Sequence, residues 1–556
     1  MDVTDRPQLA YAPRRRLAFD LTSSKLLTLQ IVVILIVAAI LRFNQIGQPL
    51  TDVFSWRQTS TAMMADNFFH RDWNIFFPEV NWNGPGPSYQ GREFQTVSYL
   101  AALLYTVFGQ YDWIGRTVAA LFGLWSIFAL YQLVRRAWDE LHAIAAAAIL
   151  ALMPGAIFID RSFLPDPAMV ALVTTSVWMA VAYFQTEKLR YLVLASLIGS
   201  LGFLTKLPGL IVALPMAYAA FAILERGWLT QTRIPFILTL AAFCALAPVI
   251  YYYNWARELA LTYPPYHFAG SGNWVWVDGF VKWWNQGYFV SRSMTNFYYW
   301  LWTGPIMGLA ALGLLFRPAA ARSNLAAAYN DPSSEKSDKA PWLFHWWLVG
   351  CVLFYIIGAR ELNENPWNFH LFNIPIAVLA GHGLVLLWLW GSQSSSARSA
   401  LLRVGLVVLL LTGVCLNVLP TLYKPDHATQ SYRMGLALRE MTQPNDLVVT
   451  LANDIGDPVA IYYSQRRGWV FPPADIDRAW NELPEDDAEA IQLFDQLRAQ
   501  GANWFGVVNE RKKDFWVDHP ELVDYIKRTC EFKVKTDDYV IYRIMTPDEV
   551  AKLPKK

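Results

Sequence analysis

Long apolar runs, each followed by a short polar segment, fill the first three quarters of the chain. A helix needs about 20 apolar residues to cross a bilayer. A stretch at 94–108 is shorter and amphipathic, and we expect it to lie on the membrane surface or to re-enter it. The pattern predicts a polytopic α-helical membrane protein with about eleven to thirteen transmembrane helices. The eleven longest runs lie at 26–43, 113–135, 141–159, 165–184, 190–206, 208–224, 233–253, 296–316, 342–358, 372–390 and 401–420.

The basic residues of the short loops all fall on one side of the membrane when these eleven runs are counted as spans. Lys and Arg gather in cytoplasmic loops, so the count predicts a cytoplasmic N-terminus at 1–25. It predicts a multi-pass protein of the cell (inner) membrane with two long loops outside the cytoplasm, the first outer loop (44–112) and the second outer loop (254–295). We interpret the first apolar run as an uncleaved helix, because no small-residue cleavage site follows it.

The segment from 421 to 556 has a different composition from the rest of the chain. It holds 41 of the 91 charged residues, as a water-soluble domain would. Alternating apolar positions predict strands at 446–451, 468–472, 503–508 and 532–544, and 488–501 reads as an amphipathic helix that stops at a glycine. The sequence therefore predicts a membrane domain over 26–420 and an extracytoplasmic α/β domain after it.

Composition excludes several classes of protein. Only 16% of the residues are charged and 54% are hydrophobic, against about 25% charged in soluble domains. The formal net charge of +1 gives no field that would attract nucleic acid. Three of the four cysteines lie in apolar runs, so we expect no disulfide framework and no CxxC metal site.

Acidic residues mark the predicted outer face. Asp52 follows the first span, with Arg57 five residues later; it suits a general base at a partly desolvated depth, or a cap on the helix that follows. Asp160 and Asp166 lie between the third and fourth spans. Asp160 suits an ion pair with Arg161, whereas Asp166 suits either a helix cap or a second active carboxylate.

Cations gather on the same face. Lys206 lies between two spans, and Arg92 and Glu93 precede the 94–108 stretch. Lys and Arg at a membrane edge bind a phosphate head group while their stems stay in the apolar layer; for Lys206 the alternative is simple snorkelling to the interface. His370 with Glu93 is compatible with a metal site, although an interfacial histidine fits equally.

Several motifs carry a resemblance to a known family. They are the acid after the first span, SYLAALLYTVFG (98–109), RSFLPDPAMV (161–170), FLTKLP (203–208) and NFHLFNIPIAVLAGHGL (368–384). Together they resemble the bacterial GT-C glycosyltransferases (family 39-like) related to protein O-mannosyltransferases and lipid A aminoarabinose transferases. The resemblance implies a GT-C fold, a polyprenyl-phosphate-sugar donor, and inverting transfer of the sugar on the extracytoplasmic side.

The resemblance also implies roles for individual residues. Asp52 matches the catalytic acid of the family, and Asp166 matches a second functional acid. Glu93 matches the acid before the stretch that leads into the second span, and Lys206 matches a lysine on the phosphate side. The chain departs from the family at Val53, where the family often has Glu. It departs again at Gln95-Thr96, where the family has Pro-Pro.

These observations predict a glycosyltransferase, with Asp52 and Asp166 as catalytic residues and Arg57, Arg92, Glu93, Lys206 and His370 in substrate binding. The expected partners are a polyprenyl-phosphate-sugar donor, a protein, lipid or glycan acceptor, and the membrane. No cofactor is required by this chemistry, although a divalent metal is possible at Glu93 and His370. The alternatives are a transporter or flippase of a lipid-linked sugar and a sensor; acids clustered at one membrane edge favour the enzyme.

Overall fold

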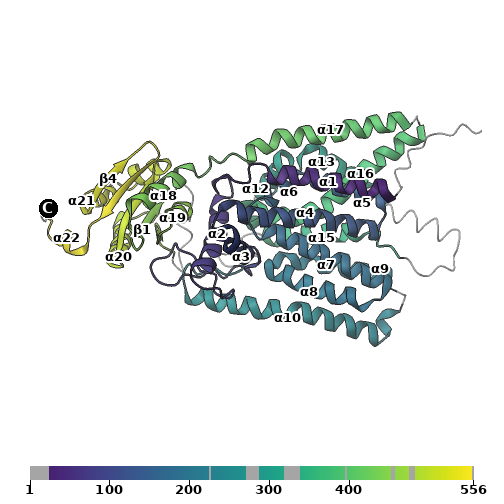
Figure 1. Cartoon of the computed structure of the whole chain (residues 1–556), viewed down its shortest axis with the longest axis horizontal. Coiled ribbons are helices and arrows are strands. Elements are labelled where there is room, and N and C mark those ends of the chain that lie inside the picture. The colour runs from purple at the N-terminus through teal and green to yellow at the C-terminus, as the bar shows by residue number, and fades with distance from the viewer. Residues whose placement is uncertain are drawn as a thin grey trace, which may run out of the picture.

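The computed structural model has two parts, a helical bundle and a smaller domain with a sheet at one end of it (Figure 1). It describes residues 24–224, 227–270, 287–318, 338–394, 397–452, 457–474 and 483–553. The predicted cytoplasmic N-terminus at 1–25 and the Trp-rich part of the second outer loop therefore lie almost wholly outside the described residues.

Each of the eleven predicted runs coincides with helix. Within the described residues, six helices are long and apolar enough to cross a membrane by length and composition, or seven if a bent pair is one span. The other four runs are helical but shorter, so their crossing stays a prediction. The six are α4 (Asp112–Ala137), α7 (Asp166–Thr186), α10 (Arg233–Thr262), α15 (Leu343–Glu364), α16 (Asn373–Ser394) with the turn η4 (Pro366–Phe372) before it, and α17 (Ala397–Leu422).

The third predicted span, 141–159, is not one straight helix. It consists of α5 (Glu140–Leu152) and α6 (Pro154–Asp160), bent by 67° at the break between them. Proline at 154 explains the break, because its ring displaces the preceding turn and it donates no backbone hydrogen bond. The shorter apolar helices are α1 (Ser24–Phe43), α3 (Thr96–Phe108), α8 (Leu189–Thr205), η1 (Leu207–Val212) with α9 (Ala213–Ile223), and α13 (Thr303–Leu315), which follows α12 (Tyr288–Asn296) and the π-helical turn η3 (Phe297–Leu301).

The second outer loop begins later than the sequence predicts, because α10 continues to Thr262 rather than ending at 253. A short turn, η2 (Trp228–Thr230), precedes α10. The first outer loop holds α3 and the polar helix α2 (Ser55–His70), which lies between the bundle and the sheet domain (Figure 1). Although α2 carries two Ser and two Thr with other polar residues, most of its residues are buried.

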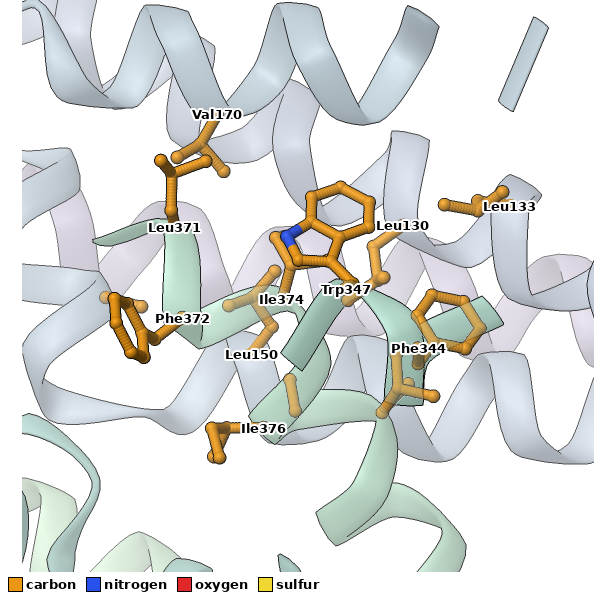
Figure 2. Packing of buried hydrophobic residues seen from close by; sticks show 14 of the residues in the cluster. Leu130, Leu133, Leu150, Val170, Phe344, Trp347, Leu371, Phe372, Ile374 and Ile376 are labelled. Atoms are coloured by element: carbon orange, nitrogen blue, oxygen red, sulfur yellow. The ribbon is translucent and has the colours of Figure 1, made fainter. Parts of the chain in front are cut away.

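Aromatic and branched side chains fill the centre of the bundle. Trp347 of α15 is fully buried and lies among side chains from α4, α5, α7 and α16, including Leu130, Val170 and Ile374 (Figure 2). Elsewhere small residues bring backbones together: a Cβ at Gly313 of α13 would lie 1.9 Å from the carbonyl oxygen of Leu379 in α16. Close backbone approach of this kind is how helices pack in lipid, where the hydrophobic effect does not drive their association.

The C-terminal domain is an α/β domain, as predicted. Its sheet has the strand order β2-β1-β3-β5-β4, in which β1 is parallel to β2 and β3, and β5 is antiparallel to β3 and β4. The predicted single strand at 532–544 is wrong: it is a hairpin whose turn is Thr536–Asp538, because Asp favours turns over strands and the Thr536 hydroxyl accepts from the backbone N–H groups of Asp538 and Tyr539. The strands are β1 (Leu447–Leu451), β2 (Arg467–Val470), β3 (Ala502–Val508), β4 (Cys530–Lys535) and β5 (Tyr539–Ile544); the helices and turns are α18 (Thr429–Met441), α19 (Val459–Ser464), α20 (Asp487–Ala499), η5 (Asn509–Arg511), η6 (Lys512–Val517), α21 (Pro520–Thr529) and α22 (Pro547–Ala551).

Specific hydrogen bonds join the two parts. Tyr462 and Tyr463 of α19 donate to the two carboxylate oxygens of Asp112 at the start of α4, each at 2.7 Å. In the first outer loop, Gly84 N donates to Gly468 O of β2 at 2.7 Å, and Gly468 N donates to Asn81 O at 3.0 Å. The first outer loop is therefore held between bundle and sheet. Asp66 of α2 lies in this joint, where burial and then the charge of Asp112 raise its pKa well above the ordinary value.

Candidate active site

A cavity of about 380 Å³ opens between α15, η1 and the first outer loop. Its lining has one polar end and one apolar end. The polar groups are Arg57, Arg92, Glu93, Lys206, Glu361 and Asn368; the apolar side chains include Leu207, Pro208, Ile211, Phe354 and Ile357.

The course of α15 explains the two ends. Phe354 and Ile357 are three residues apart on one face of the helix, and Glu361 lines the same cavity beyond the kink at Gly358, close to the C-terminal end of α15. On the opposite wall Lys206 precedes η1, and Ile211 lies further along the turn. The cavity therefore fits a ligand with a charged head and an apolar tail.

The structure brings Lys206 and Asp166 together. Lys206 Nζ donates to Asp166 Oδ1 at 2.8 Å and to Asn368 Oδ1 at 2.6 Å, and Lys206 is only 7% exposed. Lys206 thus lies in a fixed ion pair rather than extending freely to the membrane surface. Asp166 starts α7 but its side chain caps no backbone group, so its contact with Lys206 explains its position better than capping does.

Arg57 and Glu93 form a second ion pair in the cavity wall. Burial alone would raise the pKa of Glu93, but the charges of Arg57, Lys206 and Arg92 together hold it below its ordinary value. Arg57 is 2% exposed, and its Nη1 has no hydrogen-bond partner among the described residues. Burial and the neighbouring charge of Arg57 lower the pKa of Arg92. The polar end therefore holds three cations, and among the described residues the Nη1 donor of Arg57 remains available to a ligand.

Asp52 occupies a different position. It is fully buried and is not among the described residues that line the cavity. Its carboxylate accepts from Arg116 (2.8 Å), from Gln58 Nε2 (2.7 Å) and from the backbone N–H of Phe54 (3.0 Å). The helix begins at Ser55 with Phe54 as its N-cap, so Asp52 forms a turn before α2 rather than capping it. Its catalytic role stays a prediction.

Asp160 and His370 lie in a separate buried cluster. Asp160 pairs with Arg42 of α1 at 2.7 Å, so the predicted pair with Arg161 is wrong; Arg161 Nη2 donates instead to the carbonyl oxygens of Asn44 and Gln45. His370 Nε2 lies 2.9 Å from Asp160 Oδ1, and its Nδ1 accepts from Asn373.

This placement of His370 bears on the metal prediction. Both ring nitrogens face protein partners other than Glu93, and His370 is not among the described cavity residues. Across the described ranges, no three or more His, Cys, Asp or Glu side chains gather as they would around a metal ion. In the described residues, Glu93 and His370 are therefore not arranged to bind a metal ion together.

Sequence reasoning missed Glu361 and Asn368. The predicted spans at 342–358 and 372–390 left both residues in the segment between them, whereas α15 continues through Glu361 past a non-helical Gly358 (φ −125°, ψ 32°). No periodic signal in the sequence marks Glu361, because the kink at Gly358 interrupts the helix face before it.

Comparisons with known proteins agree with this architecture. Residues 96–252 match the family model described as dolichyl-phosphate-mannose-protein mannosyltransferase. The "Putative mannosyltransferase YkcB" of Bacillus subtilis is 23% identical over 223 residues, which are 40% of this chain and only 30% of that protein.

Two solved structures match most of the chain. ArnT from Cupriavidus metallidurans bound to undecaprenyl phosphate has a TM-score of 0.59 at 12% identity, covering 93% of this chain and 98% of that one. The archaeal oligosaccharyltransferase AglB from Archaeoglobus fulgidus, in complex with an inhibitory peptide and a dolichol-phosphate, has a TM-score of 0.56 at 12% identity, covering 91% of this chain and 73% of that one. These likenesses show the GT-C fold, which confirms the predicted fold class.

Proposed function

We propose that this chain is a glycosyltransferase that moves a sugar from a polyprenyl-phosphate donor to an acceptor hydroxyl of a protein, lipid or glycan. The observation that carries the proposal is the two-ended cavity, with three cations at one end and apolar side chains at the other. A lipid phosphate has the same division of charge. The lipid phosphates named for the ArnT and AglB structures support the same ligand class.

In this proposal the donor phosphate lies against Lys206, Arg57 and Arg92, and the polyprenyl chain follows Ile211 and Ile357 toward the lipid. Lys206 is positioned by Asp166 and Asn368, so its ammonium is fixed before the donor arrives. The acceptor oxygen attacks the anomeric carbon from the face opposite the phosphate. The bond from that carbon to the phosphate oxygen breaks, the electron pair stays on the phosphate, and the cations stabilise the new charge. Inversion at the anomeric carbon follows.

The acceptor proton needs a base, and the proposal keeps Asp52 in that role. Asp52 can reach an acceptor only if Arg116 and Gln58 release it when substrates bind. Contacts of catalytic groups often differ between free and substrate-bound enzymes. Glu93, which already lines the cavity, is the competing candidate, and its lowered pKa makes it a weaker base.

The proposal places the reaction outside the cytoplasm. Arg57, Arg92 and Glu93 of the first outer loop line the cavity's polar end, and the basic-loop pattern predicts that this loop lies on the outer side of the inner membrane.

The proposal is tested by sugar release in nanodiscs from radiolabelled polyprenyl-phosphate hexoses and pentoses, with and without EDTA. We expect release by the wild type, unchanged by EDTA, and loss of about 10² to 10⁴-fold in Asp52→Asn. Full activity of Asp52→Asn with loss in Glu93→Gln would move the base to Glu93. No release from any donor, combined with movement of the intact donor across the bilayer, would replace the enzyme with a flippase.

A further inference from the structure

Glu361 is an unusual group to find in a cavity built for an anion. It projects from the last turns of α15, beyond the break at Gly358, into the same polar end as Lys206 and Arg92. A carboxylate repels a phosphate group at this range. The other carboxylate of the cavity, Glu93, is held by Arg57, whereas Glu361 forms no such short ion pair among the described residues.

The described residues give the Glu361 carboxylate one hydrogen bond. Asn368 Nδ2 donates to its Oε1 at 3.3 Å, a long contact, and no described residue donates to the second oxygen. Glu361 is only partly buried, so this oxygen is open to the cavity. A carboxylate has about four acceptor positions, and most of those of Glu361 are available to a ligand.

The amide of Asn368 links Glu361 to the phosphate side of the cavity. Its oxygen accepts from Lys206 Nζ at 2.6 Å, and its nitrogen donates to Glu361. An ammonium only donates and a carboxylate only accepts, so this amide orientation is required by both contacts. A group bound by Glu361 therefore lies close to a phosphate bound by Lys206.

Neither a phosphate diester nor a polyprenyl chain has a hydrogen to donate to a carboxylate. The sugar next to the phosphate has hydroxyl groups, which are donors. We propose that Glu361 accepts hydrogen bonds from free hydroxyl groups of the donor sugar and thereby selects glycosylated over sugar-free lipid phosphate. This inference rests on the proposed function, because it assumes a polyprenyl-phosphate sugar in the cavity.

The test is equilibrium binding of two ligands, polyprenyl phosphate and polyprenyl-phosphate mannose, to protein in nanodiscs. Glu361→Gln keeps the size of the side chain and removes its charge. We expect its affinity for the mannosyl ligand to fall by about 10-fold or more, as for loss of a hydrogen bond to a charged group. Its affinity for the sugar-free phosphate should stay the same or rise, because the repulsion is gone.

The matched control is Glu364→Gln, three residues later on the same helix. Glu364 is exposed and does not line the cavity, so both affinities should equal those of the wild type. A panel of 2-, 3-, 4- and 6-deoxymannose donors then identifies the hydroxyl. Removing that hydroxyl should lower the affinity of the wild type for the donor. The affinity of Glu361→Gln should fall little further, because this variant has already lost the hydrogen bond.

Three outcomes would overturn the inference: an unchanged preference for the mannosyl ligand in Glu361→Gln, the same deoxy-sugar discrimination as the wild type, or loss of both ligands, which would make Glu361 structural. If the wild-type protein binds neither ligand, the proposed function itself is refuted. The two failures are therefore distinguishable.

Discussion

The ion pair between Asp52 and Arg116 makes a measurable prediction about stability. Both side chains are fully buried, and Arg116 Nη2 lies 2.8 Å from Asp52 Oδ2. Asp52→Asn keeps the shape of the side chain but leaves a buried guanidinium without its anion. Removing one partner of a buried pair costs about 3–5 kcal/mol.

The other hydrogen-bond partners of Arg116 determine how large the loss of stability in Asp52→Asn is within this range. Arg116 also donates to the carbonyl oxygens of Gln48 (3.0 Å) and Pro49 (3.2 Å) and to Gln58 Oε1 (3.3 Å). These dipoles partly compensate the cation, so we expect about 3 kcal/mol. The thermal unfolding midpoint in detergent should fall by several degrees.

The double variant Asp52→Asn/Arg116→Gln removes both charges. We expect it to recover most of the lost stability, because the strain lies in the unpaired charge and not in the polar side chains. Thermal unfolding and sugar release are measured on both single variants and the double variant. If Asp52 is the base, the double variant regains stability without regaining turnover.

Two results would refute this reasoning. An Asp52→Asn variant as stable as the wild type would show that the ion pair contributes nothing. A double variant that regains wild-type turnover would show that Asp52 acts only by holding Arg116 and the start of α2.

Three further predictions concern other parts of the molecule. Lys206→Met should weaken binding of polyprenyl phosphate by roughly 10- to 150-fold, as for a lost charged hydrogen bond, whereas the exposed Lys188→Met should not; equal affinities would remove Lys206 from the phosphate site. Ile357→Trp should fill the apolar end and raise KM about 10-fold for long-chain donors but much less for short-chain donors, and an equal effect on both would place the chain elsewhere. Because the raised pKa of Asp66 lets the folded protein hold that proton more tightly than the unfolded chain, stability should fall as pH rises from about 4 through the folded-state pKa. Asp66→Asn should therefore unfold at a higher temperature than the wild type at pH 8 but not at pH 4, and a pH dependence identical to that of the wild type would contradict this.

Local patterns predicted most of the elements but few of their partners. Apolar runs and alternation are properties of neighbouring residues, so the helices and most strands follow from them. Asp160 illustrates the limit: its neighbour Arg161 was the obvious partner, whereas the actual partner, Arg42, is 118 residues away. The chain contains many cationic side chains far from Asp160 in sequence, and only the packing of the folded chain determines which one pairs with it.

The site shows the same division. The sequence assigned Arg57, Arg92, Glu93 and Lys206 to one face, and the structure brings these four around one cavity. Glu361 was missed because helix α15 runs on past Gly358, where the apolar pattern ends. Asp52 was singled out by its position after the first span, which gave no warning that Arg116, 64 residues later, holds it.

The bonds from Tyr462 and Tyr463 to Asp112 have a consequence for biosynthesis. They join residues 350 and 351 positions apart, so the first outer loop is translated long before its partner helix α19 exists. Contacts of such long range form late and slowly. During insertion the loop that carries Arg57 and Glu93 therefore lacks its contacts with α19 until the last domain has been translated and folded. A nascent chain arrested before residue 459 should hold that loop in a protease-sensitive state, and the completed chain should protect it.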